Sequence, residues 1–178
     1  MTIELENDVW CFKIIVAGEA SVGKTTLVNR YIAGKFTSEY KATIGVDIFT
    51  REVTFQKKND NFRVKLLVWD IAGQSLFRAF RKKFFENARS ALLVFDLTAP
   101  NSLNQLNSWI KDIHEVTGDV PLILIGNKSD LKELIEVKPE EISIFIDQHP
   151  NVVLNFNTSA LTGKNVEAAF LGLISQII

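Results

Sequence analysis

The sequence predicts a three-layer α/β domain, with a mostly parallel sheet of six strands, one antiparallel strand pair and about five helices. Short apolar runs alternate with longer segments of helical period, which is the pattern of parallel strands joined by crossover helices. A polar turn between two of the runs predicts the antiparallel pair. The chain has 178 residues and shows no repeats or linkers, so we expect residues 1–178 to form a single domain.

The first elements are expected to be a strand, a helix and a loop. Phe12 to Ala17 is an apolar run that predicts a buried strand, and the segment from Lys24 to Ala33 has helical period. Residues 35–45 have neither period, so we expect a loop there. Residues 47–56 and 62–70 then predict two strands, joined by the polar turn Lys57-Lys58-Asn59-Asp60 as a hairpin.

The second half of the chain predicts the rest of the sheet. Residues 90–96 and 121–126 are continuous apolar runs, which is typical of strands buried on both faces. Between them, residues 100–117 carry apolar residues on one face at helical spacing. The last elements are expected to be a helix at 139–148, a strand at 152–156 and a helix at 166–178.

The composition excludes several classes of protein. The chain is 47% hydrophobic and 23% charged, as in ordinary globular proteins, and its net charge of -1 gives no sign of a nucleic-acid binder. Its one cysteine, Cys11, excludes an internal disulfide. No apolar stretch approaches the roughly 20 residues that span a bilayer. We expect a cytoplasmic protein that binds no nucleic acid and meets a membrane only if a lipidated tail is missing from this chain.

A phosphate-binding motif follows the first strand. The segment Gly18 to Thr25 matches G-x-x-x-x-G-K-[ST] and opens the first helix. Glycines let backbone N–H groups turn toward phosphate oxygens, Lys24 brings a positive charge, and Thr25 offers a hydroxyl to Mg²⁺. The motif predicts a P-loop domain that binds a nucleoside triphosphate, without distinguishing ATP from GTP. The expected contacts are Glu19, Ala20, Ser21, Val22, Gly23, Lys24, Thr25 and Thr26.

A second motif favours guanine. Asn127-Lys128-Ser129-Asp130 follows the strand ending at Gly126, at the sheet edge where ligands bind. A carboxylate such as that of Asp130 can accept two hydrogen bonds from the N1–H and amine edge of guanine, which adenine does not offer. Asn157-Thr158-Ser159-Ala160 follows the next expected strand. With these elements and the phosphate loop, the chain from about Trp10 to Ile178 resembles the Ras superfamily of small GTPases.

The resemblance assigns further roles around the base. Asn127 would tie this loop to the phosphate loop, and the stem of Lys128 would lie across the guanine face. The backbone of Ser159 and Ala160 would support the base oxygen. Phe36 would pack against guanine from the other side, although without the resemblance it would be taken as a loop anchor. The family usually has lysine where this chain has Leu161, a departure that would loosen the base pocket.

Two switch segments are also implied. Asp70-Ile71-Ala72-Gly73-Gln74 resembles the D-x-x-G-Q element of the family. Asp70 would hold Mg²⁺ through a water, Gly73 would contact the γ-phosphate, and Gln74 would orient the attacking water, with Lys24 as the second catalytic residue. Tyr40 would contact the nucleotide, and Thr43 would complete the Mg²⁺ shell only when GTP is bound.

The resemblance is strongest to the Rab branch. Ile44-Gly45-Val46-Asp47 and Lys65 to Asp70 fit it, whereas Ile48 and Ile71 depart from it. We expect a monomer that meets effector, nucleotide-exchange and GTPase-activating proteins through residues 36–48 and 70–85. Trp69 and Phe84 would form an exposed effector patch, or else be half-buried packing aromatics.

Two functions remain open from the sequence alone. The favoured one is a switch that binds GTP with Mg²⁺ and hydrolyses it slowly to GDP and phosphate, in Rab-like vesicle trafficking or signalling. The alternative is a nucleotide-stabilised protein-binding module without useful hydrolysis. Ala20, near the expected position of the attacking water, is compatible with slow hydrolysis. A basic cluster just past the second switch segment is expected to be a solvated helix face; it consists of Arg78, Arg81, Lys82 and Lys83.

Overall fold

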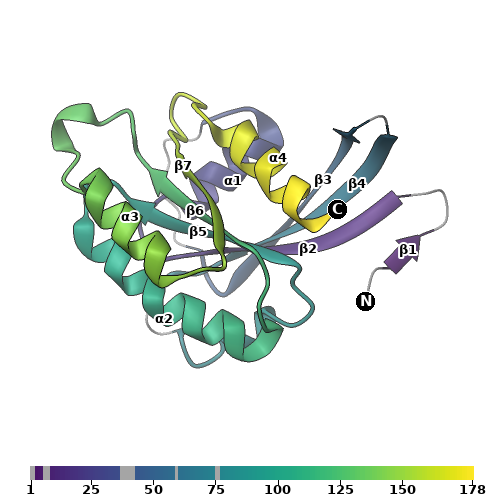
Figure 1. Ribbon diagram of the computed structural model, residues 1–178, viewed down its shortest axis with the longest axis horizontal. Helices are drawn as coiled ribbons and strands as arrows, with labels where there is room; N and C mark the ends of the chain where they lie inside the picture. The colour runs from purple at the N-terminus through teal and green to yellow at the C-terminus, as the bar shows by residue number, and fades with distance from the viewer. Residues whose placement is uncertain (1–2, 6–8, 37–42, 59, 75–76) are drawn as a thin grey trace.

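The computed structural model describes residues 3–5, 9–36, 43–58, 60–74 and 77–178, and its fold confirms the α/β class (Figure 1). The strands form one sheet in the order β3-β4-β2-β5-β6-β7. β1 pairs with the first three residues of β2. The described strands are β1 (Ile3–Leu5), β2 (Val9–Ala17), β3 (Val46–Lys57), β4 (Asp60–Ile71), β5 (Ser90–Asp96), β6 (Leu122–Asn127) and β7 (Val152–Asn157).

The helices cover both faces of this sheet, which gives three layers. Helices α1 and α4 lie on one face and α2 and α3 on the other (Figure 1). In the described part of the chain, the helices are α1 (Lys24–Ala33), α2 (Pro100–Thr117), α3 (Pro139–Gln148) and α4 (Val166–Ile177), with the short 3-10 helices η2 (Arg81–Phe84) and η3 (Lys132–Leu134). No helix among these described residues is both long and apolar enough to span a bilayer.

The six predicted strands all form, and β1 is a seventh that the sequence pattern did not predict. β1 runs antiparallel to β2, and β3 runs antiparallel to β4, while the other pairs are parallel. β2 begins at Val9 rather than at Phe12, because its first residues find partners on β4 starting at Arg63. Pairing therefore extends the strand beyond the apolar run that identifies it.

Strands β5 and β6 are buried along their whole length, as expected for the centre of a parallel sheet. Side chains from alternate faces of the sheet enter two separate apolar clusters. One cluster includes α1 and α4, with Leu27 and Phe170 fully buried, and the other includes α2 and α3, with Trp109 and Phe145 buried. The two clusters hold the helices against the sheet, so the loops at the strand ends are fixed in place.

Arg51 anchors the edge strand β3 to the helices above it. Its guanidinium makes two hydrogen bonds to the carboxylate of Glu167 on α4, at 3.0 and 3.1 Å, and lies 4.0 Å from the ring centroid of Tyr31 on α1. Tyr31 is itself stacked on Phe170, with 3.7 Å between ring centroids. One side chain on β3 thus contacts both helices of this layer.

The expectation that Arg81 belongs to a solvated basic cluster is wrong. Arg81 is only 3% exposed, and its guanidinium donates to the Asp112 carboxylate on α2 at 2.5 Å from Nη2 and 2.8 Å from Nε. The same guanidinium stacks over the Trp109 ring, 3.8 Å from its centroid. Asp112 is a partner that lies 31 residues away in sequence, so local spacing gave no sign of this pair.

Replacing Arg81 by alanine should lower the free energy of unfolding by about 3 kcal/mol, because the buried carboxylate of Asp112 would keep only the more exposed Lys82 as an ion-pair partner. Chemical denaturation measures this loss. The matched control is Lys83→Ala, which removes an exposed neighbouring cation that is not in the Asp112 ion pairs and should change stability far less. Equal losses in the two variants would contradict the buried role of Arg81.

Candidate functional site

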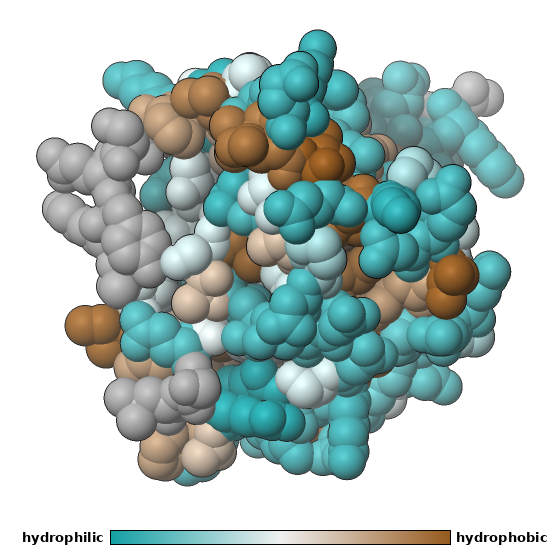
Figure 2. Space-filling model, turned by 90° about the vertical axis from the view of Figure 1, so that its left-hand side faces the viewer, coloured by the Kyte–Doolittle hydropathy of each residue, from teal (hydrophilic) through white to brown (hydrophobic). Residues whose placement is uncertain are grey.

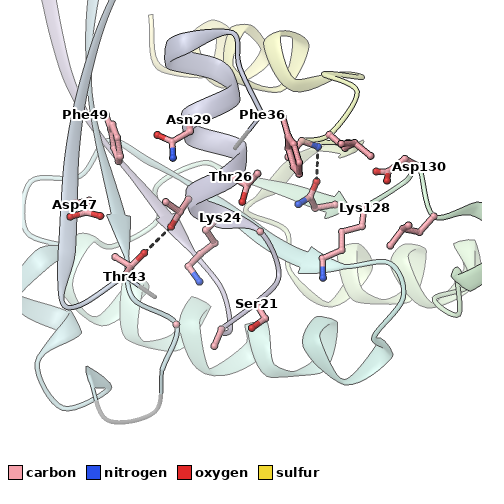
Figure 3. Close-up of a pocket in the computed structure, with 18 of the residues that line it drawn as sticks. Ser21, Lys24, Thr26, Asn29, Phe36, Thr43, Asp47, Phe49, Lys128 and Asp130 are labelled. Atoms are coloured by element: carbon pink, nitrogen blue, oxygen red, sulfur yellow. Dashed lines mark hydrogen bonds between the residues drawn. The ribbon is translucent and has the colours of Figure 1, made fainter. Parts of the chain in front are cut away.

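A cavity of about 760 Å³ lies where the carboxyl ends of β2, β4 and β6 meet the loops that follow them. This volume is in the range of sites that bind a small molecule or cofactor. Figure 2 views the molecule from this side, where mostly hydrophilic residues surround smaller apolar areas. Figure 3 shows side chains from the phosphate loop, the 43–49 segment and the 127–131 loop pointing into the cavity.

At its glycines, the phosphate loop packs so closely against its neighbours that a side chain would not fit. Gly18 has a φ of +144°, and a Cβ atom there would lie 2.1 Å from the carbonyl oxygen of Val94. Gly23 has a φ of +95°, and its Cβ would lie 2.3 Å from the amide nitrogen of the Asn127 side chain. Helix α1 begins at the next residue, Lys24, so its N-terminal N–H groups face the cavity.

Lys24 supplies the main positive charge of the cavity. Its side chain is 6% exposed, and Nζ donates to the carbonyl oxygen of Glu19 at 2.7 Å. Burial lowers the pKa of Lys24 to about 8, against the charges of Asp70 and Glu19. A cation with few partners in a buried site favours an anionic ligand.

Three oxygen-bearing side chains meet beside Lys24. Thr25 donates a hydrogen bond to Oδ2 of Asp70, and its hydroxyl lies 2.8 Å from that of Thr43. Asp70 is fully buried, and burial raises its pKa to about 6, against the hydrogen bond from Thr25 and the charge of Lys24. Its Oδ1 has no hydrogen-bond partner among the described residues. An unpaired buried carboxylate oxygen beside two hydroxyls fits the hard oxygen ligands that Mg²⁺ prefers.

Asn127 joins the phosphate loop to the loops after β6 and β7. Its side-chain amide donates to the carbonyl oxygen of Val22 at 3.0 Å. Its Oδ1 accepts from the hydroxyl of Thr158 at 3.2 Å and from the backbone N–H of Ala160 at 3.3 Å. The role of Asn127 expected from the resemblance therefore matches the observed hydrogen bonds.

The opposite end of the cavity holds the candidate base-binding residues. Lys128 has a φ of +67°, and its ammonium pairs with the buried carboxylate of Asp96 at 2.5 Å. Asp130 lies at this end, and Phe36 lines the cavity from the segment after α1 (Figure 3). Leu161 is also a lining residue of the cavity. The carboxylate of Asp130 has no ion-pair partner among the described residues.

The two switch segments meet at the third side of the cavity. The N–H of Ala72 donates to the carbonyl oxygen of Gly45 at 2.9 Å. A Cβ atom at Gly73 would lie 2.3 Å from the carbonyl carbon of Glu19 and 2.4 Å from the amide nitrogen of Ala20. Gly73 thus lies directly against the phosphate loop, as only glycine can.

Most of the predicted site residues line this cavity. They are Ala20, Ser21, Gly23, Lys24, Thr25, Thr26, Phe36, Thr43, Gly73, Gln74, Asn127, Lys128, Asp130, Ala160 and Leu161. Val22, Asp70 and Ser159 are buried behind its wall. The N–H of Ser159 donates to the carbonyl oxygen of Lys164 at 3.1 Å. The predicted contact Tyr40 lies outside the described residues.

The sequence analysis missed several residues of the cavity wall, namely Asn29, Asp47, Phe49 and Leu131. Asn29 follows Thr25 by four residues on α1, and this spacing places the two on one face of the helix. The other three have no such signal, because only the fold brings them to the cavity.

A model of the Ras family matches residues 13–178. The chain belongs to the Ras family. Similar proteins include the GTP-binding protein ypt4 of Schizosaccharomyces pombe, which is 33% identical over 99% of this chain and 75% of its own length. The Ras-related protein Rab-11A of Dictyostelium discoideum is 36% identical over 94% of this chain and 76% of its own length. The Ras-related protein rab-11.1 of Caenorhabditis elegans is 34% identical over 94% and 77%.

These relatives confirm the Rab-like resemblance of this Ras-family chain. The chain is a small GTPase, which binds GTP and GDP and hydrolyses GTP. Family membership supports the switch, and nothing in the comparisons supports the alternative of a binding module without hydrolysis.

Replacing Asn127 by alanine should weaken both the fold and the binding of guanine nucleotides. The change leaves the Val22 carbonyl, the Thr158 hydroxyl and the Ala160 N–H without their partner, at a cost of about 1–3 kcal/mol in unfolding free energy. Because two walls of the cavity would lose their connection, GTP and GDP should both dissociate faster. The increase in rate should be about the same for the two nucleotides. Stopped-flow dissociation and thermal denaturation measure the two effects.

Ser129→Ala is the matched control for this change. Ser129 lies in the same loop and is buried, but its hydroxyl has no hydrogen-bond partner among the described residues. We expect little change in either measurement. If the Asn127→Ala variant binds nucleotide as tightly as the control, Asn127 does not connect the two walls of the cavity in the way described.

Proposed function

We propose that this chain is a Rab-like switch of vesicle trafficking, in which bound GTP and Mg²⁺ order the two switch segments for partner proteins. The observation that carries the proposal is the cluster of Lys24, Thr25, Thr43 and Asp70, which combines a buried cation with oxygens suited to a metal. Thr43 belongs to one switch segment and Asp70 begins the other. A ligand bound to this cluster therefore acts on both segments.

The residues that would hold Mg²⁺ are Thr25, Thr43 and, through a water, Asp70. When bound, the ion would neutralise charge on the phosphate oxygens. Lys24 would bind the β- and γ-phosphates, and the Gly73 N–H would donate to the γ-phosphate. Gln74 would orient a water for attack on the γ-phosphorus, which releases phosphate and leaves GDP.

Loss of the γ-phosphate would remove one partner from each segment, since Thr43 and Gly73 lie on different segments. The hydrogen bond from Ala72 to Gly45 supports a coupled response, because it links the segments next to these two residues. The output of the cycle would be a change of binding surface rather than a chemical product.

An exposed apolar surface supports partner binding through parts of residues 36–48 and 70–85. Ile44 is 80% exposed, Ile48 55% and Phe80 59%. Trp69 and Phe84 are half-buried and in tilted contact, with ring centroids 6.4 Å apart. The two aromatics therefore pack on the domain and also contribute to this surface, which we propose receives effector, exchange and GTPase-activating proteins. We propose that the chain itself acts as a monomer.

The first test is to identify the nucleotide that co-purifies with the chain and to follow its hydrolysis with Mg²⁺ in a single turnover. We expect GDP or GTP, with intrinsic turnover far below the roughly 10 s⁻¹ that is the median for enzymes. Gln74→Leu should slow hydrolysis by about 100-fold, because it removes the group that orients the water.

Gln105→Leu is the control for the Gln74 variant, since it makes the same exchange at an exposed position of α2 away from the cavity. Its hydrolysis rate should equal that of the unaltered protein. Adenine nucleotide in the site would overturn the role of Asp130, and guanine nucleotide without any hydrolysis would favour a binding module.

Gly73→Ala should weaken GTP relative to GDP by about 10- to 100-fold, the range of one hydrogen bond to a charged group. The added methyl group meets the Glu19–Ala20 backbone and displaces the N–H that would serve only the γ-phosphate. Gly34→Ala is the control, since its φ of +65° gives strain but its Cβ would meet no atom within 4 Å. Equal weakening of both nucleotides by Gly73→Ala would refute this assignment.

A further inference from the structure

Trp109 contacts both the phosphate loop and η2, the short helix that follows the second switch segment. Its indole Nε1 donates to the carboxylate Oε1 of Glu19 at 3.0 Å, across 90 residues of sequence. The face of the same ring carries the guanidinium of Arg81, 3.8 Å from the ring centroid. Arg81 is held in turn by Asp112, three residues after Trp109 on the same helix. One face of α2 therefore bridges the phosphate loop and η2.

Packing alone does not require the indole N–H. Trp109 is 1% exposed and lies in the apolar cluster of α2 and α3, where the carbon atoms of its ring make the packing contacts. A buried indole N–H needs a partner, and here the partner is a carboxylate, which forms a stronger bond than a neutral acceptor. The bond fixes the direction of the Glu19 side chain away from the cavity.

Glu19 is also the residue at which the phosphate loop meets its other contacts. Its carbonyl oxygen accepts from Lys24 Nζ at 2.7 Å, and Gly73 lies against the peptide that joins it to Ala20. The side chain that binds Trp109 and the backbone that faces the nucleotide site thus belong to one residue. The backbone of Glu19 therefore contacts both Lys24 and Gly73.

We propose that Trp109 is a positioning residue that holds Glu19, and through it the Glu19–Ala20 peptide, in the place where Gly73 and Lys24 can serve the γ-phosphate. This inference rests on the proposed function, since it assumes that Gly73 binds the γ-phosphate of GTP. GDP has no such group, so loss of the indole bond weakens GTP more than GDP. The contact with Arg81 joins η2, which follows the second switch segment, to the same support.

The bond itself can be tested by NMR of the full chain labelled with nitrogen-15. The Trp109 indole N–H signal is assigned by its loss in Trp109→Phe. We expect Glu19→Ala to shift this signal and to speed its exchange with solvent, whereas Glu19→Gln, which keeps an acceptor oxygen, should shift it less. An unchanged signal in Glu19→Ala would overturn the proposal.

The effect on the site is measured by the ratio of GTP to GDP affinity with Mg²⁺. Trp109→Phe and Glu19→Ala should each lower this ratio about tenfold, which corresponds to about 1.4 kcal/mol. The double variant should lower it no further, because both changes break one interaction. Ile113→Val, which trims a buried side chain one turn along α2, should lower thermal stability and leave the ratio unchanged.

The remaining outcomes separate this inference from the proposed function. If the unaltered chain binds no guanine nucleotide, the proposed function fails, while the NMR experiment still reports on the bond. If the unaltered chain binds GTP and GDP but Glu19→Ala keeps the original ratio, or if the two single effects add, only the positioning role of Trp109 fails. Should Trp109→Phe not fold, the Glu19 variants decide the question.

Discussion

The nucleotide site depends on the buried carboxamide of Asn127. A parallel sheet brings the carboxyl ends of its strands to one edge, but it does not fix how the loops beyond those ends approach one another. Asn127 does so by joining the phosphate loop to the loops after β6 and β7 through three hydrogen bonds. Its amide also occupies the space beside Gly23, where a Cβ would lie 2.3 Å away. With Asn127 in this place, position 23 of the phosphate-binding motif has room only for glycine.

The protein stabilises the charged forms of two groups in the site, Lys24 and Asp70, less well than water does. Burial disfavours the charged forms of both Lys24 and Asp70, as the directions of their pKa shifts indicate. A ligand that brings phosphate charge to Lys24 and a cation to Asp70 would offset both costs at once. Binding energy of this kind adds directly to the stability of the folded state. The fold and its ligand are then best regarded as one thermodynamic system.

The sequence predicted the fold and most of the cavity wall, because both are encoded by local patterns. Three helices begin and end where periodicity, proline and glycine indicate. They are Lys24–Ala33, Pro100–Thr117 and Pro139–Gln148. The burial of Arg81 and the bond between Trp109 and Glu19 were not predictable, since each joins residues at least 28 positions apart through packing of α2. Asp47 and Phe49 were missed as wall residues for the same reason, because the cavity rather than their own sequence selects them.

The contacts of Arg51 limit how this molecule can move. A slip of β3 by one residue along β4 would turn the side chain of Arg51 to the opposite face of the sheet, away from Glu167 and Tyr31. The contacts of Arg51 therefore favour the observed register of β3 on β4 over one shifted by a residue. Gly45 stands immediately before β3 with a φ of +78°, and a Cβ atom there would meet no atom within 4 Å. A change of backbone direction at Gly45 would therefore alter the residues before β3 without shifting the pairing of β3 with β4.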